Sequence, residues 1–484
     1  MTAPVLRDYQ RDAVVEIRAA FGNGVKRVLL TSPTASGKTV LFSHIAAGVA
    51  AKGKRVVIMA HRDELLRQVS ESLSRFDVPH AVMAGGVRGI PRTPVVVASV
   101  FTLARRLAHF PRPDLIVVDE CHHCAGQTTF SKVIAHFPQS LVLGVTATPT
   151  RLDGQGLGDV FQQLILGPST ANLTALGYLA PAEIYAPAIL PDLTGIRTRA
   201  GDYAQDQLAT AMDKPTITGD AVAHYRKLAD GKAAVAFCCS VKHAEDVAAQ
   251  FCAAGYRAAS VDGRMDKDKR RQIIADLTQG RLQILTSCEI ISEGVDVPHL
   301  ECGIMLRPTQ SLSLHLQQIG RCLRIYPGKT AAIILDHAGN ALRHGLPDDP
   351  REWTLAGAER KGKRDDVPAL RTCQQCLAIH RPAPKCPRCG HVYEVQSRKV
   401  DHVEGELRKL VRDANAAEVA SVDLMERARR REALRQAQSR EALAAIAKER
   451  GYKIGWVDYV MAARAKNKEK KAVVPGDLVD KPTE

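Results

Sequence analysis

Short runs of consecutive hydrophobic residues alternate with helix-like stretches over the first 340 residues of the chain. Five runs form a first block, at Arg27–Thr31, Arg55–Ala60, Val95–Ser99, Asp114–Asp119 and Leu141–Thr146. Four more form a second block, at Ala233–Cys238, Leu282–Thr286, Glu301–Leu306 and Thr330–Leu335. Continuous hydrophobic strands separated by helices are typical of parallel sheets covered on both faces. The pattern therefore predicts an α/β protein with two tandem parallel-sheet domains.

Smaller parts are predicted around these two domains. Pro and Gly residues interrupt any period over 187–215, which predicts a loop-rich connector. The pattern stops again after Asn340, where a linker is expected. The predicted organisation is a first domain over 1–186, a connector over 187–215, a second domain over 216–345, a linker over 346–370, a cysteine-rich module over 371–395, a basic helical tail over 400–470 and a frayed end over 471–484.

The composition is that of an ordinary folded protein. With 484 residues, 45% hydrophobic and 25% charged, the chain is not a disordered polymer, a collagen or a coiled-coil rod. No hydrophobic run approaches the ~20 residues of a membrane-spanning helix, and the first residues lack a secretory signal, so no membrane partner is expected. We therefore expect a reducing, cytoplasmic compartment, in which the 12 Cys residues are thiols or metal ligands.

The charge of the chain indicates its kind of partner. There are 67 Lys and Arg against 52 Asp and Glu, and the net charge is +15. Residues 351–484 hold 29 of these basic and 20 of these acidic residues, so the basic excess is denser in the last third. Solubility alone would explain some excess, but a nucleic-acid partner is the favoured hypothesis.

A phosphate site is predicted where the first hydrophobic run meets a helix. Residues 31–39 read TSPTASGKT. Backbone N–H groups of such a turn form a concave anion site together with the helix N-terminus. Lys38 would reach the β- and γ-phosphates of a nucleotide, and Thr39 would hold Mg²⁺. The predicted ATP contacts in this segment are Thr34, Ala35, Ser36, Gly37, Lys38 and Thr39.

Acidic residues for the same site follow the strand at Asp114–Asp119, where the sequence reads DECH. Asp119, at the end of a strand near the phosphate turn, can hold Mg²⁺ directly or through water. Glu120 is placed to orient and deprotonate an attacking water. A metal site built from Cys121, His122, His123 and Cys124 is the alternative, but four consecutive donors cannot easily surround one tetrahedral ion.

With TSPTASGKT, DECH and TATP (Thr146–Pro149) in this order, the sequence resembles the superfamily-two helicases of the DEAD/DEAH type, from about Leu6 to Ile325. The resemblance implies two RecA-like domains that close on ATP. LRDYQ at Leu6–Gln10 and AHRDELLRQ at Ala60–Gln68 are similar to the family's adenine and nucleic-acid motifs. EGVDVP at Glu293–Pro298 and QQIGRCLR at Gln317–Arg324 are similar to its motifs five and six.

The resemblance adds further residue roles and agrees with the catalytic roles given above for Lys38, Asp119 and Glu120. It implies an adenine contact at Gln10, a nucleic-acid contact at Arg62, coupling residues at His122, Thr146 and Thr148, further ATP contacts at Gly294 and Asp296, and catalytic residues at Lys38, Asp119, Glu120, Gln317, Arg321 and Arg324. Two positions depart from the family. Ser32 and Ala35 stand where relatives have glycines, and alanine tolerates a left-handed backbone poorly.

A zinc module is predicted from cysteine spacing. Two CxxC turns, Cys373/Cys376 and Cys386/Cys389, lie nine residues apart. Each turn places two thiolates on one side of an ion, so the pair completes a tetrahedron around a structural Zn²⁺. The other eight Cys lack such spacing and are expected to be buried thiols. Basic residues around the module indicate either a nucleic-acid contact or a charged surface.

The whole chain is also similar to the bacterial and phage RadD-like helicases, on the segments Gly201–Pro215 and Gly451–Trp456. That resemblance implies work in DNA repair or recombination with repair proteins as partners. Three functions stay open: a DNA helicase or translocase, an RNA helicase, and the motor subunit of a restriction-type complex that does not unwind by itself. The Arg cluster at 427–431 indicates either a solvated helix face or a contact with DNA or protein.

Overall fold

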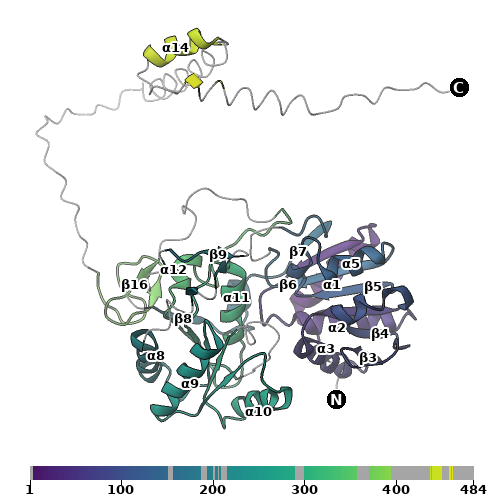
Figure 1. Cartoon of the computed structure of the whole chain (residues 1–484), viewed down its shortest axis with the longest axis horizontal. Helices are drawn as coiled ribbons and strands as arrows, with labels where there is room; N and C mark the ends of the chain where they lie inside the picture. The colour runs from purple at the N-terminus through teal and green to yellow at the C-terminus, as the bar shows by residue number, and fades with distance from the viewer. Residues whose placement is uncertain are drawn as a thin grey trace, which may run out of the picture. The chain divides into compact units, whose positions relative to one another are not determined.

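The fold is taken from a computed structural model of the whole chain. It describes residues 4–150, 156–186, 193, 195–199, 202–204, 207–208, 215–288, 299–356, 370–393, 437, 439–449, 457–458 and 461. The chain divides into two compact units, Met1–Val395 and Gln396–Glu484. The first unit holds both parallel sheets and the cysteine-rich module (Figure 1).

Seven parallel strands form the first sheet, in the order β3-β4-β2-β5-β6-β1-β7. The strands are β1 (Arg27–Thr31), β2 (Val56–Ala60), β3 (His80–Met83), β4 (Val95–Ser99), β5 (Leu115–Asp119), β6 (Leu141–Thr146) and β7 (Gln163–Leu166). β6 pairs with β1 on one side and with β5 on the other. The carboxyl ends of β1 and β5, which precede the phosphate turn and the DECH segment, therefore lie at the same edge of the sheet, one strand apart.

Helices cover both faces of this sheet. α1 (Asp8–Gly22), α2 (Lys38–Ala50) and α3 (Asp63–Arg75) pack on one face, and α4 (Val100–Ala104) and α5 (Thr129–His136) pack on the other. The side chains of β1 alternate between them, because successive residues of a strand point to opposite faces. Val28 and Leu30 join the core under α1 and α2, whereas Leu29 joins the core under α4 and α5. This is why the strand reads as a continuous hydrophobic run.

Six parallel strands form the second sheet, in the order β12-β13-β11-β14-β15-β8. The strands are β8 (Ala182–Tyr185), β11 (Ala234–Phe237), β12 (Ala258–Val261), β13 (Ile284–Ser287), β14 (Cys302–Met305) and β15 (Ala332–Asp336). α8 (Pro215–Leu228) and α9 (Val241–Ala253) cover one face, and α10 (Lys267–Thr278) and α11 (Leu312–Cys322) cover the other. The predicted fold class, two tandem parallel-sheet domains with helices on both faces, is confirmed.

The nine predicted strands are present with ends that differ by at most two residues from the hydrophobic runs. Other strands were not predicted. β8 lies within the residues assigned to the first domain, yet it pairs with β15 at the edge of the second sheet. The short hairpin of β9 (Thr198–Arg199) and β10 (Asp202–Tyr203) lies within the predicted connector. These pairings join residues far apart in sequence or very short segments, neither of which leaves a local hydrophobic pattern.

The remaining described elements are small. α6 (Thr170–Ala175) follows β7, and α12 (Asn340–His344) follows β15. β16 (Arg371–Thr372) and β17 (Ile379–His380) form a two-stranded sheet in the cysteine-rich module. In the second unit the described helix is α14 (Arg440–Glu449), and the Arg cluster at 427–431 lies outside the described residues. Among the described helices, none combines the length and the hydrophobicity that crossing a membrane requires.

Candidate functional site: a cavity between two parallel-sheet domains

The phosphate turn joins β1 to α2 through residues 32–37. Gly37 precedes the first residue of α2 and has a left-handed backbone with φ of 81°. Ala35 is also left-handed, with φ of 68°. The turn is braced inside by the hydroxyl of Ser32, which donates to the Ser36 hydroxyl at 2.7 Å. Ser32, in the place of a glycine, therefore supplies a side-chain hydrogen bond to the turn.

Lys38 lies at the start of α2 with its ammonium group folded back over the turn. Its Nζ donates to the backbone carbonyl oxygens of Ser32 and Pro33, each at 3.1 Å. Burial lowers the pKa of Lys38, while the neighbouring Glu120 and Asp119 carboxylates oppose that shift. The ammonium group is therefore held by two neutral acceptors that a phosphate oxygen could replace.

Asp119 and Glu120 are buried at the carboxyl end of β5. The Glu120 backbone N–H donates to Asp119 Oδ1 at 3.0 Å. Burial, followed by the Glu120 charge, raises the pKa of Asp119 to about 7, and Lys38 opposes the shift. Glu120 has a left-handed backbone with φ of 50°. A non-glycine residue in this conformation stores strain, which is common at functional sites.

A chain of polar contacts leads from Glu120 to the second domain. His122 lies 3.4 Å from Glu120 Oε2, and its Nδ1 lies 3.1 Å from the Thr146 hydroxyl. The Thr146 hydroxyl donates to the Thr148 carbonyl oxygen at 3.0 Å. The Thr148 hydroxyl in turn contacts the hydroxyl of Ser313, in the first turn of α11. The predicted coupling residues are thus brought together in one continuous path between the domains.

α11 brings the second domain to the phosphate turn. A Cβ atom on Gly320 would collide with Thr34 Cβ and would lie 3.0 Å from Thr34 Cγ2, so glycine permits this close approach. Arg321 and Arg324 follow on the same helix and its end, and burial lowers the pKa of Arg324 to about 10. Gln317 is buried on α11 but is not among the residues that line the cavity described below.

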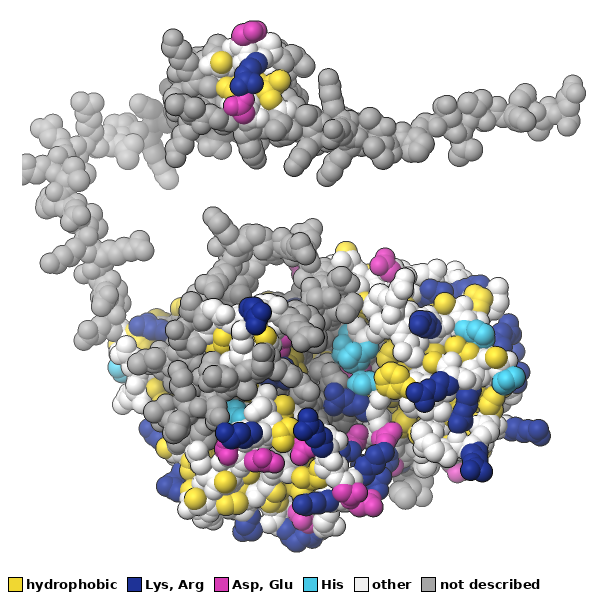
Figure 2. Space-filling model, viewed as in Figure 1, with side chains coloured by type: hydrophobic (Ala, Val, Ile, Leu, Met, Phe, Trp, Pro, Cys, Tyr) yellow, Lys and Arg dark blue, Asp and Glu magenta, His cyan; other side chains and the backbone are white. Residues whose placement is uncertain are grey.

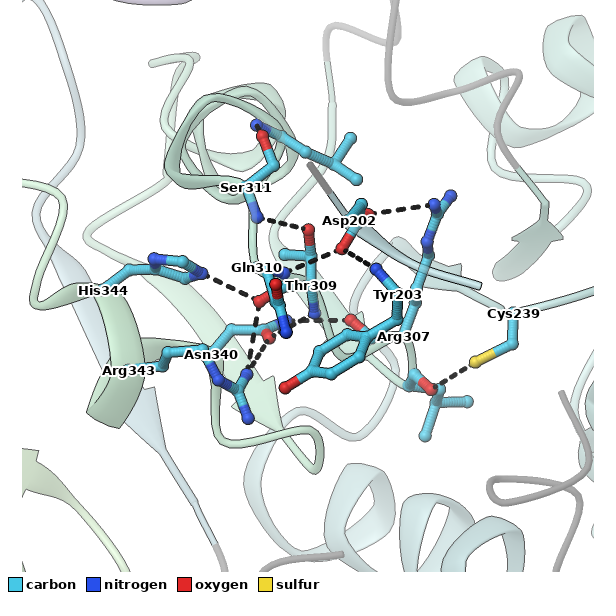
Figure 3. Close-up of polar contacts among 12 residues, drawn as sticks. Asp202, Tyr203, Cys239, Arg307, Thr309, Gln310, Ser311, Asn340, Arg343 and His344 are labelled. Atoms are coloured by element: carbon cyan, nitrogen blue, oxygen red, sulfur yellow. Dashed lines mark hydrogen bonds and ion pairs between the residues drawn. The ribbon is translucent and has the colours of Figure 1, made fainter. Parts of the chain in front are cut away.

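The loop before α11 is fixed by the polar network in Figure 3. Asp202, from the β9–β10 hairpin, accepts from the Gln310 N–H at 2.8 Å and pairs with Arg307 at 3.3 Å. Asn340 accepts from the Thr309 N–H at 3.0 Å. Ser311 then caps α11 by accepting from the Leu314 N–H at 3.2 Å. This network sets the direction in which α11 presents its arginine residues.

These elements enclose one cavity of about 230 Å³ between the two domains. Its predicted lining residues come from both domains, with Lys38, Thr39, Asp119 and Glu120 from the first and Arg321 and Arg324 from the second. One face of α3 also lines it, which the sequence did not predict; its residues there are Leu65, Gln68, Glu71, Ser72 and Arg75. The helical period of the α3 sequence indicates that one face is buried, but it does not identify the part of the protein that this face contacts.

Gln10 and Arg62 lie outside this cavity. Gln10 is buried, and its amide donates to the carbonyl oxygens of Ser36 and Gly37 at 3.3 and 3.2 Å. It braces the phosphate turn from behind in this structure. Arg62 precedes α3, and its Nε lies 3.1 Å from His61 Nε2. Gly294 and Asp296 lie outside the described residues, so their predicted contacts with ATP stay predictions.

The four predicted zinc ligands form a compact cluster. The Sγ atoms of Cys373, Cys376, Cys386 and Cys389 all lie within 4.8 Å of one another. The Cys373–Cys389 and Cys376–Cys386 pairs have Sγ–Sγ distances of 3.7 Å. Four thiolates at the ~2.3 Å Zn–S distance of a tetrahedral site would be about 3.8 Å apart, so the donor set and spacing fit zinc.

The other eight Cys residues are less uniform than the sequence predicted. Six are buried, but Cys252 is exposed and Cys288 is half-buried. Cys252 lies on α9, on the solvent side of the helix, and its thiol donates to the Ala258 carbonyl oxygen at 3.4 Å. Burial of a thiol follows the helix face on which it lies, which residue type alone does not determine.

Two family models match the chain, one within each of the two domains. Residues 3–151 match the family model "Type III restriction enzyme, res subunit", and residues 217–326 match "Helicase conserved C-terminal domain". The chain is 34% identical over 375 residues to the "51.5 kDa protein" of a Lactococcus phage, which covers 76% of this chain and 79% of the phage protein.

Two further proteins are similar to more than two thirds of the chain. The chain is 29% identical over 359 residues to the "Putative ATP-dependent helicase IRC3" of Saccharomyces cerevisiae, and the match covers 70% of this chain but 52% of the yeast protein. The solved structure "ATP-dependent Type ISP restriction-modification enzyme LlaBIII bound to DNA" has a TM-score of 0.52 at 18% identity, over 69% of this chain and 28% of that one. The chain thus spans about half of the yeast relative and about a quarter of the restriction enzyme.

Proposed function

Because the chain belongs to the superfamily-two helicases, we propose that it couples ATP hydrolysis to movement along nucleic acid. The cavity between the domains is the observation that carries this proposal, since groups for phosphate binding and for charge stabilisation enter it from both sheets. Neither domain alone supplies the full set. ATP would therefore bind the closed pair of domains better than the open pair, and loss of the γ-phosphate would favour opening.

Each group in the cavity has a role in this proposal. Lys38 and the N–H groups of the turn would bind the phosphates, and Glu120 would orient and deprotonate the attacking water. Arg321 and Arg324 would stabilise the charge that develops on the transferred phosphoryl group. Thr39 and Asp119 line the same cavity and offer the hydroxyl and carboxylate oxygens that Mg²⁺ prefers, so they would hold the metal ion that neutralises the phosphates.

The charges in the cavity support a polyphosphate ligand. Three cationic side chains (Lys38, Arg321 and Arg324) face two carboxylates (Asp119 and Glu120). Arg321 and Arg324 add to the lowering of the pKa of Lys38 that burial begins. A bound polyphosphate would relieve this repulsion, so the arrangement of charges is suited to bind one.

DNA is the proposed polymer, and repair or recombination is the proposed process. The net charge of +15 supports a polyanionic partner. The restriction enzyme of similar fold is described as bound to DNA. Of the segments behind the RadD-like resemblance, Gly451–Trp456 lies outside the described residues, and Gly201–Pro215 is described only at 202–204, 207–208 and 215. The repair role and a cytoplasmic location are therefore proposed from sequence alone. The four-cysteine cluster is proposed to hold a structural Zn²⁺.

The basic surface does not by itself identify the polymer's path. On the face in Figure 2, Lys and Arg side chains are spread over both domains and many lie beside Asp and Glu side chains. Two such pairs join the domains: Lys267 contacts Asp63, and Arg270 contacts Glu64. These pairs lie next to Arg62, the predicted nucleic-acid contact.

The test compares ATP hydrolysis with single-stranded DNA, duplex DNA and RNA at one salt concentration. We expect DNA to stimulate wild type most. Lys38→Ala should lose ATP binding and hydrolysis, whereas Glu120→Gln should keep binding and lose about 10²–10⁴-fold in turnover. Glu16→Gln, an exposed change on α1, is the matched control. Equal turnover of wild type and Glu120→Gln would remove Glu120 from the mechanism, and stimulation by RNA alone would favour the RNA helicase.

A restriction-type motor subunit is the second candidate, because residues 3–151 match the res subunit model. Such a subunit would hydrolyse ATP on DNA without separating strands. A strand-displacement assay with a labelled duplex separates the two. Robust DNA-stimulated hydrolysis with no displacement would favour this candidate.

A further inference from the structure

The segment that follows the second sheet returns to the first domain. Residues 345–356 leave α12 and reach the first domain at Leu355, whose side chain packs against the hydrophobic core under α4 and α5. The Gly158 N–H, between β6 and β7, donates to the Leu355 carbonyl oxygen at 2.9 Å. A Cβ atom on Gly158 would lie 3.2 Å from that oxygen, so glycine lets the two backbones meet. The sequence predicted only a linker here.

The other end of this segment is firmly attached to the second domain. The Arg351 guanidinium group donates to the carbonyl oxygens of Leu346 at 2.7 Å and His344 at 3.3 Å. Asp349 is almost fully buried and accepts from the Leu346 N–H at 2.8 Å. These bonds fold residues 345–351 into a compact turn at the end of α12.

Two neighbouring structures hold that turn. α12 is fixed by His344, which donates to the Thr309 carbonyl oxygen at 2.9 Å in the network of Figure 3. From the cysteine-rich module, Arg381 pairs with Asp349 at 2.6 Å. The turn at residues 345–351 is therefore held both by the loop that precedes α11 and by the cysteine-rich module.

Between its two ends, the segment forms one wall of a second cavity, of about 310 Å³. Pro347, Asp349, Arg351 and Trp353 line this wall. Thr34 of the phosphate turn and Gly320 of α11 line it as well, and these two residues make the close contact between the domains. The segment thus spans the boundary of the domains beside the contact that completes the ATP cavity.

We propose that residues 345–356 are an interdomain strap that favours the closed arrangement, and that Gly158 and Leu355 are positioning residues for ATP hydrolysis. The strap adds a second crossing of the chain between the domains, after the connector. Fixing its end on the first domain limits how far α11 moves from the phosphate turn. This role rests on the proposed ATPase function.

The first test is hydrogen exchange on the full chain without nucleotide or nucleic acid. The Gly158→Val side chain would push the Leu355 backbone away, and Leu355→Ala would remove its packing. Peptides covering 157–161 and 346–356 should exchange faster in both variants than in wild type. Gly85→Val and Leu176→Ala, at exposed positions of the first unit, are the matched controls. Unprotected exchange of both peptides in wild type would overturn the strap.

The second test is steady-state ATP hydrolysis by the same variants. Weaker closure should raise KM for ATP by about five- to tenfold in Gly158→Val and Leu355→Ala, with DNA affinity unchanged. Wild-type KM and kcat in variants whose strap exchanges freely would overturn the positioning role. No ATP hydrolysis by wild type, with a protected strap, would instead reject the proposed function and leave the exchange result standing.

A disulfide between the strap and the first domain tests the same role by hindering opening of the domains instead of weakening closure. The Gly158 and Leu355 Cβ positions are 3.7 Å apart, within the range of a disulfide. The double variant Gly158→Cys/Leu355→Cys should cross-link under mild oxidation, as detected by peptide mass spectrometry. Opening would then be slowed, so turnover should fall and recover with reductant, while Leu355→Cys alone should not respond. Unchanged turnover of fully cross-linked enzyme would overturn the strap's effect on closure.

Discussion

At the residue scale, the phosphate turn uses a backbone conformation that its sequence disfavours. Ala35 is left-handed, with φ of 68°. We expect Ala35→Gly to raise the free energy of unfolding by about 0.5–1 kcal/mol, because glycine adopts this conformation without strain. Urea denaturation measures the change. Gly37→Ala should act in the opposite direction, since its Cβ would lie 2.6 Å from Gln10 Nε2. A destabilised Ala35→Gly variant would contradict this account.

A buried histidine in the second domain should make stability depend on pH. Burial lowers the pKa of His344 to about 4, below its ordinary value of 6.5. Between these values the unfolded chain binds the proton and the folded chain does not. The contribution of neutral His344 to the free energy of unfolding is therefore fully present above pH 6.5. It is lost as the pH falls toward 4, by up to about 1.4 kcal/mol per pH unit.

His344→Gln isolates this effect, since glutamine keeps a donor for the Thr309 carbonyl oxygen but cannot be protonated. Urea denaturation of both proteins between pH 7 and pH 4.5 should show a shallower loss of stability in the variant. The same loss in wild type and variant would assign the pH dependence to other groups.

At the element scale, the sequence predicts those strands and turns that local residue patterns encode. Strands buried on both faces are continuous hydrophobic runs, so β1 and β5 were found together with the phosphate turn and the acidic residues at their ends. The sequence predicts that 182–185 belongs to the first domain and that 346–370 is a linker, whereas β8 pairs in the second sheet and Leu355 packs on the first domain. In both cases the partner strand or core lies far along the chain, and no period within the segment identifies it. The hydrogen bonds of Gln10 to the phosphate turn likewise join residues 26 and 27 positions apart, which no local pattern shows. The predicted adenine contact of Gln10 stays a prediction.

The contact between α11 and the phosphate turn depends on a single glycine. Gly320→Ala should keep ATP binding by the first domain but lose at least about 10²-fold in turnover, because Arg321 and Arg324 would no longer reach the phosphates. Nucleotide binding and steady-state hydrolysis measure the two effects.

A second substitution shows whether crowding is the cause. The three atoms nearest to an alanine Cβ at position 320 all belong to the Thr34 side chain. Gly320→Ala combined with Thr34→Gly should therefore regain turnover relative to Gly320→Ala alone. No recovery would mean that the substitution acts through α11 itself.

At the scale of the whole molecule, coupling runs through contacts that the two domains share. The Thr148–Ser313 contact links the TATP segment to α11, and the Arg270–Glu64 pair links α10 to α3. The cysteine-rich module joins the same unit through β8, since the Ala186 N–H donates to the Leu377 carbonyl oxygen at 3.1 Å and Arg388 pairs with Glu183. The module therefore extends the edge of the second sheet.

Because the module packs on β8, the Zn²⁺ proposed for its four-cysteine cluster should contribute to the stability of the second domain. We expect purified protein to carry about one zinc per chain, the stoichiometry of a four-thiolate site. Cys386→Ser should lose the metal and release the module from β8, which leaves the edge of the sheet unpaired. Metal analysis and thermal denaturation measure the two effects, at about 2–4 °C for each kcal/mol lost.

Cys252→Ser, which removes an exposed thiol outside the cluster, should change neither zinc content nor melting temperature. Two results would contradict the zinc site or its structural role. Equal zinc in wild type and Cys386→Ser would place the metal elsewhere. Loss of zinc with an unchanged melting temperature would mean that the module holds its fold and its contact with β8 through the hydrogen bonds of β16 and β17 alone. We do not expect this second result, because β16 and β17 have two residues each. A sheet of this size is too small to order the module without the metal.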